Sequence, residues 1–179
     1  MKNLTPFLQN FILHWGEMGT KWGINRTVAQ IHALLFTSEK PLNAEEICEM
    51  LGVARSNVSN SLKELQNWGI VKVVHIPGDR RDHFESMKDV FEMFRVIAAE
   101  RKRREIDPTL AMLNDCAEDA GKTKAKADEY AKKQLEDLRE FFELASDFYD
   151  RMNKLPTKSA VKAVKMGDKL LKSLGLFTK

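Results

Sequence analysis

The side chains best suited to recognition chemistry lie between residues 55 and 63, on one face of a predicted helix. They are small polar groups interleaved with cations: Arg55, Ser56, Asn57, Ser59, Asn60 and Lys63. The opposite face carries Val58, Leu62 and Leu65 at spacings of four and three, which predicts burial on that side. A helix fits the major groove of duplex DNA, where asparagine is suited to adenine and arginine to guanine. We therefore expect the polar face to contact base edges.

A second pair of cations, Arg80 and Arg81, lies in the turn Pro77–Asp82. The flanking segments Ile70–Ile76 and His83–Met87 are too short for helices, and the first is rich in β-branched residues, so together they predict a β-hairpin. A hairpin tip with two arginines can enter the minor groove, where the negative potential is focused. Helix, turn, polar helix and basic hairpin together are the order of a winged helix-turn-helix.

Local signals predict the helices that must position this unit. Asn43 is a helix N-cap with Glu46 at the third position, as in a capping box, and Gly52 ends that helix. Helices are also predicted from Thr5 to about Lys21, with Thr5 as N-cap, and from Asn25 to about Thr37. The fold class is thus mainly α, a winged helix-turn-helix with a small hairpin wing and additional dimerisation helices.

The C-terminal half is predicted to be helical throughout. Asp107 and Pro108 are expected to restart a helix as N-cap and first residue, after the charged run Arg101–Glu105. A heptad seam then predicts a long helix packed along its length: Ala131, Leu135, Leu138, Phe142, Ala145, Tyr149 and Met152. Leu155 and Pro156 should end it. Thr157 caps a last helix whose role stays open, with a row of lysines on one face: Lys158, Lys162, Lys165, Lys169 and Lys172.

These elements divide the chain into three predicted regions. Residues 1–37 are N-terminal helices of a dimer scaffold, residues 38–87 are the winged helix-turn-helix, and residues 88–179 are a C-terminal helical dimerisation region.

Several short motifs within residues 43–87 resemble the winged-helix domain of MarR-superfamily regulators. They include Leu51-Gly52-Val53, Asn57-Val58-Ser59, Trp68-Gly69-Ile70-Val71 and Gly78-Asp79-Arg80-Arg81-Asp82. Upstream, Glu17-Met18-Gly19 and Trp22-Gly23-Ile24-Asn25-Arg26 are similar to the GbsR-type branch of that superfamily. The resemblance implies a homodimeric transcriptional regulator, usually a repressor, that binds double-stranded DNA. It also implies a quaternary-ammonium effector such as choline, since that branch is associated with choline and betaine metabolism.

The charge balance is informative only when resolved by position. The 179 residues carry 29 basic and 26 acidic side chains, for a net charge of +3, and residues 1–90 are neutral with ten of each. Glu45, Glu46 and Glu49 lie on the supporting helix, whereas Arg55, Lys63, Arg80 and Arg81 lie on the predicted DNA-facing surfaces. We therefore expect the two signs to be segregated in space, with few phosphate contacts per subunit.

The remaining composition argues against other classes of protein. No nucleophile elbow, phosphate-binding glycine loop or apolar carboxylate pair indicates an enzyme, and the four histidines form no metal motif. No apolar run is long enough to span a membrane, no signal peptide is evident, and the two cysteines form no disulfide framework. A cytoplasmic protein without a cofactor is expected. A winged-helix protein-interaction module that does not bind DNA is the alternative.

An effector site is the weakest of the predicted features. A quaternary ammonium needs aromatic ring faces around it, and five rings are candidates: Trp15, Trp22, Phe91, Phe94 and Tyr149. For each ring taken alone, the apolar core of a dimer interface is the preferred interpretation. Cys48, beside the core residue Ile47, is interpreted as an inert thiol in preference to a redox sensor.

Overall fold

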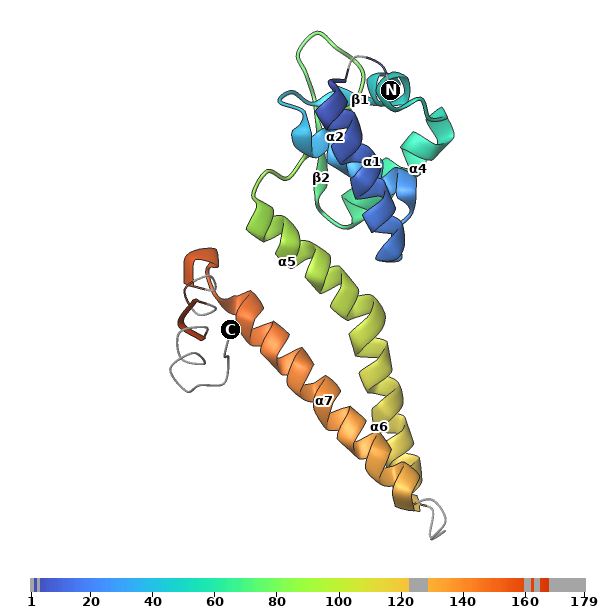
Figure 1. Ribbon diagram of the computed structural model, residues 1–179, viewed down its shortest axis with the longest axis vertical. Coiled ribbons are helices and arrows are strands. Elements are labelled where there is room, and N and C mark those ends of the chain that lie inside the picture. Colours follow the sequence, from blue (N-terminus) through green and yellow to red (C-terminus); the bar gives the residue numbers. More distant parts are fainter. Residues whose placement is uncertain (1, 3, 123–128, 160–161, 163–164, 168–179) are drawn as a thin grey trace. The chain divides into compact units, whose positions relative to one another are not determined.

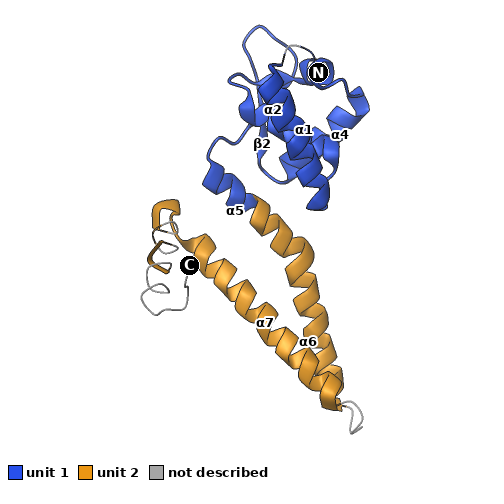
Figure 2. Cartoon of the chain, in the orientation of Figure 1, with its two compact units in different colours: residues 1–96 blue, residues 97–179 orange. Residues whose placement is uncertain are grey.

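The computed structural model describes residues 2, 4–122, 129–159, 162 and 165–167 (Figure 1). The chain divides into two compact units, residues 1–96 and residues 97–179 (Figure 2). Within the described residues no helix is both long and apolar enough to cross a membrane. Cys48 and Cys116 are both free and half-buried.

The first unit has the predicted winged-helix fold. Its elements are α1 (Pro6–Lys21), α2 (Arg26–Thr37), β1 (Leu42–Asn43), α3 (Ala44–Leu51), α4 (Arg55–Asn67), β2 (Val71–Val74) and β3 (His83–Ser86). The strands form an antiparallel sheet in the order β1-β3-β2, in which Val73 is opposite Phe84 and Leu42 is opposite Phe84 on the other side. The short strand β1 was not expected, and the hairpin strands are shorter than predicted.

The centre of this unit is α2, which is buried on all sides. Every residue from Val28 to Leu35 is buried, and Ile31 and Leu34 have no exposed surface. α1, α3, α4 and β3 all contact α2. Residues 1–37 therefore pack as part of the winged-helix unit and not as a separate scaffold. The physical reason is that a helix buried all round needs neighbours on every face, and α3, α4 and β3 supply them.

Two glycines allow α1 to lie close against α2. A Cβ atom added at Gly19 would lie 2.5 Å from the Cβ of Ala29, and one at Gly16 would lie 2.6 Å from Cγ of Gln30. Both distances are shorter than any normal carbon–carbon contact, so larger side chains at these positions would push the helices apart. The closest packing of α1 against α2 therefore depends on these two glycines.

The predicted caps are largely confirmed. Asn43 Oδ1 accepts a hydrogen bond from the Glu46 N–H at 3.0 Å, and Glu46 Oε2 accepts one from the Asn43 N–H at 2.7 Å. α3 ends at Gly52, whose φ of 70° lies in the left-handed region that favours glycine. Thr5 precedes α1 as predicted, but its side chain makes no capping hydrogen bond.

The prediction that a helix restarts at Asp107 is wrong. α5 (Val90–Arg101) runs through a π-helical turn, η1 (Lys102–Ile106), directly into α6 (Asp107–Lys122). Asp107 has helical φ and ψ of −60° and −44°, and its N–H donates to the carbonyl of Lys102, five residues back. Pro108 explains the widened turn, because a proline ring clashes with the carbonyl four residues earlier in an ordinary α-helix.

In the second unit α6 packs against α7 (Glu129–Lys154), as the heptad seam predicted in part. Leu135, Phe142, Ala145, Tyr149 and Met152 are half-buried, whereas Ala131 and Leu138 are exposed. The helix ends before Leu155 and Pro156 as expected. Of the predicted lysine row, Lys169 and Lys172 lie outside the described residues.

Lys88 fixes the point at which the chain leaves the sheet. Its Nζ donates to the carbonyl oxygens of Leu35 and Phe36, each at 2.9 Å, and of Ser38 at 2.7 Å. These carbonyls are at the C-terminal end of α2, where a cation is favoured by the helix dipole. The residue that follows the wing is thereby attached to the central helix of the unit.

His32, on α2, is a buried titratable group of this core. It is 4% exposed, it packs between Trp15 and Phe36, and its Nε2 has no hydrogen-bond partner. Burial, and secondarily the charge of Lys88, lower the pKa of His32 to about 4. The folded protein thus keeps this imidazole neutral at a pH at which the unfolded chain would protonate it.

This histidine should make the winged-helix unit sensitive to acid. Because the folded pKa lies below the ordinary value of 6.5, the free energy of unfolding should fall as the pH drops from about 6.5 to 4, by up to about 3 kcal/mol. His32→Phe and His32→Gln, neither of which takes up a proton there, should both flatten this dependence in urea unfolding measured between pH 7 and pH 4. An unchanged slope in both variants would contradict the assignment.

Candidate nucleic-acid interface

The helix α4 is held by an apolar side that leaves its polar face free. Val58, Leu62 and Leu65 are at most 2% exposed, and Ser61 is buried beside them. The predicted recognition residues lie on the remaining surface, all exposed except the half-buried Ser59. Ala54 precedes the helix and has no side chain that could cap it, so no side-chain cap binds the first N–H groups of α4.

The predicted residues of α4 are divided between two grooves. The larger groove, of about 310 Å³, lies between α4, the start of α3 and the wing, and is lined by Arg55, Ser59 and Lys63 from α4. Because these residues are four apart, they form one line along the helix. Asn57 and Asn60 instead line a smaller groove, about 200 Å³, with Asn25 and Thr27 at the start of α2. Ser56 is exposed in the first turn and lines neither.

We call the larger of these the wing-side groove. Its full lining is Ala44, Glu45, Arg55, Ser59, Leu62, Lys63, Gln66, Val73, Arg81, Asp82 and Phe84. Glu45, Gln66 and Asp82 were not among the residues predicted to contact DNA. The helix-turn-helix order offers a signal for Glu45, because the turn at Gly52 brings the start of α3 against the start of α4.

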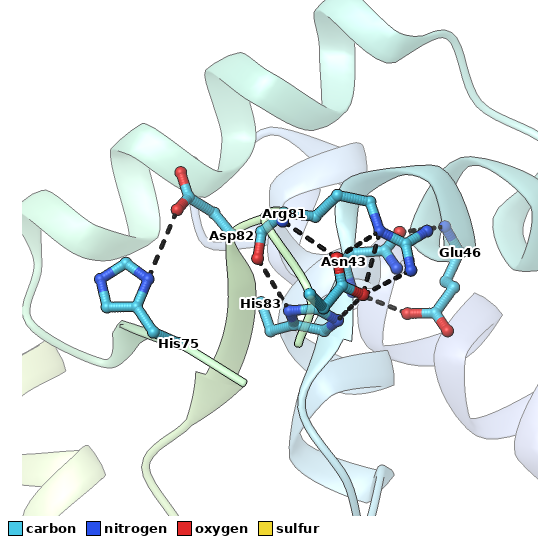
Figure 3. A network of polar contacts seen from close by, with 7 residues as sticks. Asn43, Glu46, His75, Arg81, Asp82 and His83 are labelled. Atoms are coloured by element: carbon cyan, nitrogen blue, oxygen red, sulfur yellow. Dashed lines mark hydrogen bonds and ion pairs between the residues drawn. The ribbon is translucent and has the colours of Figure 1, made fainter. Parts of the chain in front are cut away.

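The two arginines of the wing differ in their surroundings. Arg80 is exposed in the loop between β2 and β3. Arg81 is turned back toward the start of α3 and lies near Asn43 and Glu46 (Figure 3). Its backbone N–H and its Nε both donate to Asp79 Oδ1, at 3.0 and 2.9 Å. Arg81 is therefore part of the wall of the wing-side groove and does not project from the tip of the hairpin.

Asp79 organises the wing loop around Arg81. Besides Arg81, its carboxylate lies 3.5 Å from Nε2 of the buried His83, whose Nδ1 is 3.0 Å from the Arg81 carbonyl (Figure 3). The hydrogen bonds from Arg81 hold the pKa of Asp79 far below its ordinary value. Asp79 thus stays ionised at any physiological pH, and the loop conformation does not depend on its titration.

The expected segregation of charge is wrong for Glu45. Its Oε1 accepts a hydrogen bond from Nη1 of Arg55 across the wing-side groove, in a close ion pair. This bond, and more weakly the charge of Arg81, lower the pKa of Glu45. Spacing along α3 could not show this, because the contact joins two helices ten residues apart. Glu49, one turn further along, faces Lys2 at 3.8 Å instead.

Of the predicted effector residues, two contact each other within the first unit. Trp15 and Trp22 lie together, with ring centroids 5.8 Å apart and planes perpendicular, and Trp15 also contacts Phe11 and His32. In this packing the edge of one ring lies against the face of the other. Phe91 and Phe94 are 55% and 66% exposed on α5, and Tyr149 is on α7 in the other unit. Binding of a quaternary ammonium stays a prediction.

Comparison with known proteins identifies the domain. Residues 22–82 match the family model for the MarR family. Over these residues the chain is similar to the MarR family. The match begins at Trp22, after α1, and includes the whole of α2. It ends at Asp82, so it includes α3, α4, β2 and the wing loop.

Relatives of the whole chain are regulators of transcription. The chain is 24% identical over 136 residues to the HTH-type transcriptional repressor GbsR of Bacillus subtilis, covering 75% of each protein. It is 21% identical over 141 residues to the repressor OpcR of the same organism, covering 75% of this chain and 74% of that protein. The resemblance to the GbsR-type branch is therefore confirmed, and the relatives of known role are repressors of transcription.

The fold extends beyond the matched domain. A crystal structure of a transcriptional regulator superposes with a TM-score of 0.64 at 16% identity, covering 83% of this chain and 96% of that one. The fold, a winged-helix unit followed by long helices, is thus shared with that structure. Among the described residues no group of three histidine, cysteine or acidic side chains could hold a metal ion.

Proposed function

We propose that this protein is a homodimeric transcriptional regulator that binds specific duplex DNA through α4 and the wing, and acts as a repressor. The observation that carries the proposal is the exposed polar face of α4, flanked by two polar grooves in a MarR-family domain. A helix in the major groove needs recognition groups on its outer face and phosphate-binding groups on both flanks. The two lines of side chains on α4 meet this requirement.

Each predicted residue has a role in this proposal that follows from its position. Ser56, Asn57 and Asn60 lie toward the outer face and the α2 side, where amide groups can donate to and accept from base edges. Arg55, Ser59 and Lys63 face the wing side. Arg80 is the exposed cation of the hairpin and is suited to the minor groove, whereas Arg81 holds the wing against α3.

A second copy of the chain is the proposed partner of the exposed apolar residues in the second unit. On α7 the face opposite the ion pairs of Arg139 exposes Leu138 by 43%, Phe141 by 63%, Leu144 by 70% and Phe148 by 64%. Such a row is too apolar for an isolated surface and suits a helix–helix interface. A two-fold dimer would present two α4 helices to successive major grooves, one DNA turn apart, about 34 Å.

Ligand control belongs to the same proposal. A ligand that changes the separation of the two α4 helices would change the fit to DNA, because two half-sites must be contacted at once.

DNA binding should depend on salt and on the cations of α4. For a duplex selected from a random-sequence pool, Lys63→Ala should weaken binding and lower the slope of log K against log salt by about one. Lys21→Ala, which removes an exposed lysine outside both grooves, is the matched control and should leave the slope unchanged. Fluorescence anisotropy between 50 and 200 mM salt measures both. If the unaltered protein selects no duplex and shows no salt-dependent binding, the protein-interaction module is favoured.

The dimer should depend on the apolar face of α7. Phe141→Ser removes a side chain that is 63% exposed, so the monomer should fold as before while the dimer dissociates at concentrations at least roughly tenfold higher. Met112→Ser on α6 removes an apolar side chain that is 50% exposed outside this face, and it should leave association unchanged. Sedimentation equilibrium gives the two dissociation constants, and equal values would exclude this face as the interface.

A further inference from the structure

The wing-side groove contains a carboxylate where the proposed function calls for cations. Glu45 lines the groove together with Arg55, Lys63 and Arg81, and Asp82 is a second acid there. Glu45 is exposed, and its partner Arg55 is 58% exposed at the side chain, so neither charge is buried and both are accessible to a ligand. The pair therefore does not serve to stabilise the core.

The ion pair sets what Arg55 can bind. A phosphate that approaches Arg55 must displace or share its guanidinium with Glu45 and is repelled by the Glu45 charge. Every duplex offers phosphates, whatever its sequence, so this repulsion lowers affinity for all DNA. A guanine edge carries no formal charge and accepts from the same guanidinium, so it suffers less from the neighbouring carboxylate.

From this arrangement we propose that Glu45 is a specificity-determining residue: it holds Arg55 across the groove and suppresses sequence-independent binding to phosphate. The inference rests on the proposed function, since it assumes that the wing-side groove faces DNA. Glu45 lowers the affinity for phosphate, whereas the cations around it raise that affinity. Glu45 acts through Arg55 and is thus a positioning residue for DNA recognition.

The position of Glu45 favours this role over a structural one. In the first turn of α3, Glu46 already forms the capping box with Asn43, so Glu45 is not needed to begin the helix. Its carboxylate instead reaches the first residue of α4, at the end of the recognition helix where a phosphate is also favoured by the helix dipole. The carboxylate thus accepts a hydrogen bond from a guanidinium group that could otherwise donate to a phosphate.

The test compares Glu45→Gln with Glu49→Gln. Both remove one negative charge from an exposed position of α3, but Glu49 pairs with Lys2 and lies outside the groove. Two probes are used: a 25-base-pair duplex of scrambled sequence and a duplex selected by the unaltered protein from a random pool. Anisotropy titrations at several salt concentrations give the affinity and the salt slope for each, and thermal unfolding checks that both variants are folded.

Glu45→Gln should raise affinity for the scrambled duplex by roughly fivefold to tenfold over Glu49→Gln and steepen the salt slope by about one, as one more phosphate is contacted. The ratio of selected to scrambled affinity should fall. In an Arg55→Gln background the same substitution should have no further effect, because the group through which Glu45 acts is gone.

Equal affinities for Glu45→Gln and Glu49→Gln would overturn the inference, since the effect would then reflect net charge alone. A lower affinity of Glu45→Gln for both duplexes would also overturn it. Neither result would contradict the proposed function, because the unaltered protein would still bind its selected duplex. If the unaltered protein binds neither probe, the proposed function fails first, and the inference fails with it.

Discussion

The winged-helix unit depends on the burial of α2. Eight consecutive buried residues, Val28–Leu35, leave no face of this helix for solvent. α1 closes one side through Gly16 and Gly19, and the helix-turn-helix and β3 close the others. Because α4 is anchored on this helix, its polar face has a fixed direction. Lys88 donates hydrogen bonds to carbonyls at the C-terminal end of α2, so the segment that leads from β3 to α5 is also held by α2.

This dependence also links the core to the candidate site. The capping box at Asn43 sets where α3 begins, and the start of α3 supplies Glu45 to the groove in front of α4. The wing is held on the same side by Asp79, Arg81 and His83. A groove of mixed charge results, with cations that attract phosphate and a carboxylate that restrains one of them. Modest net charge is then consistent with recognition that favours base edges over bulk electrostatic attraction.

Much of the fold was predictable because its signals are local. Asn43 with Glu46, Gly52, and the spacing of Val58, Leu62 and Leu65 depend only on neighbours within one or two helical turns, and each prediction is confirmed. The errors arise where distant contacts decide. Pro108 indicated a helix start, yet a π-helical turn lets the helix continue through it. α2 also contacts α3, α4 and β3, which follow the predicted boundary at residue 38, and such contacts cannot be read from the periodicity of one helix.

The sequence by itself determined the order of elements, the winged-helix class and the polar face of α4, because periodicity and capping are properties of short segments. Only the tertiary structure decided how charges meet. Glu45 lies ten residues before Arg55 and reaches it across a turn, and Arg81 folds back on Asp79 instead of extending from the wing. Such contacts depend on the angle between packed elements, which is set by burial of the core and leaves no periodic trace in the chain.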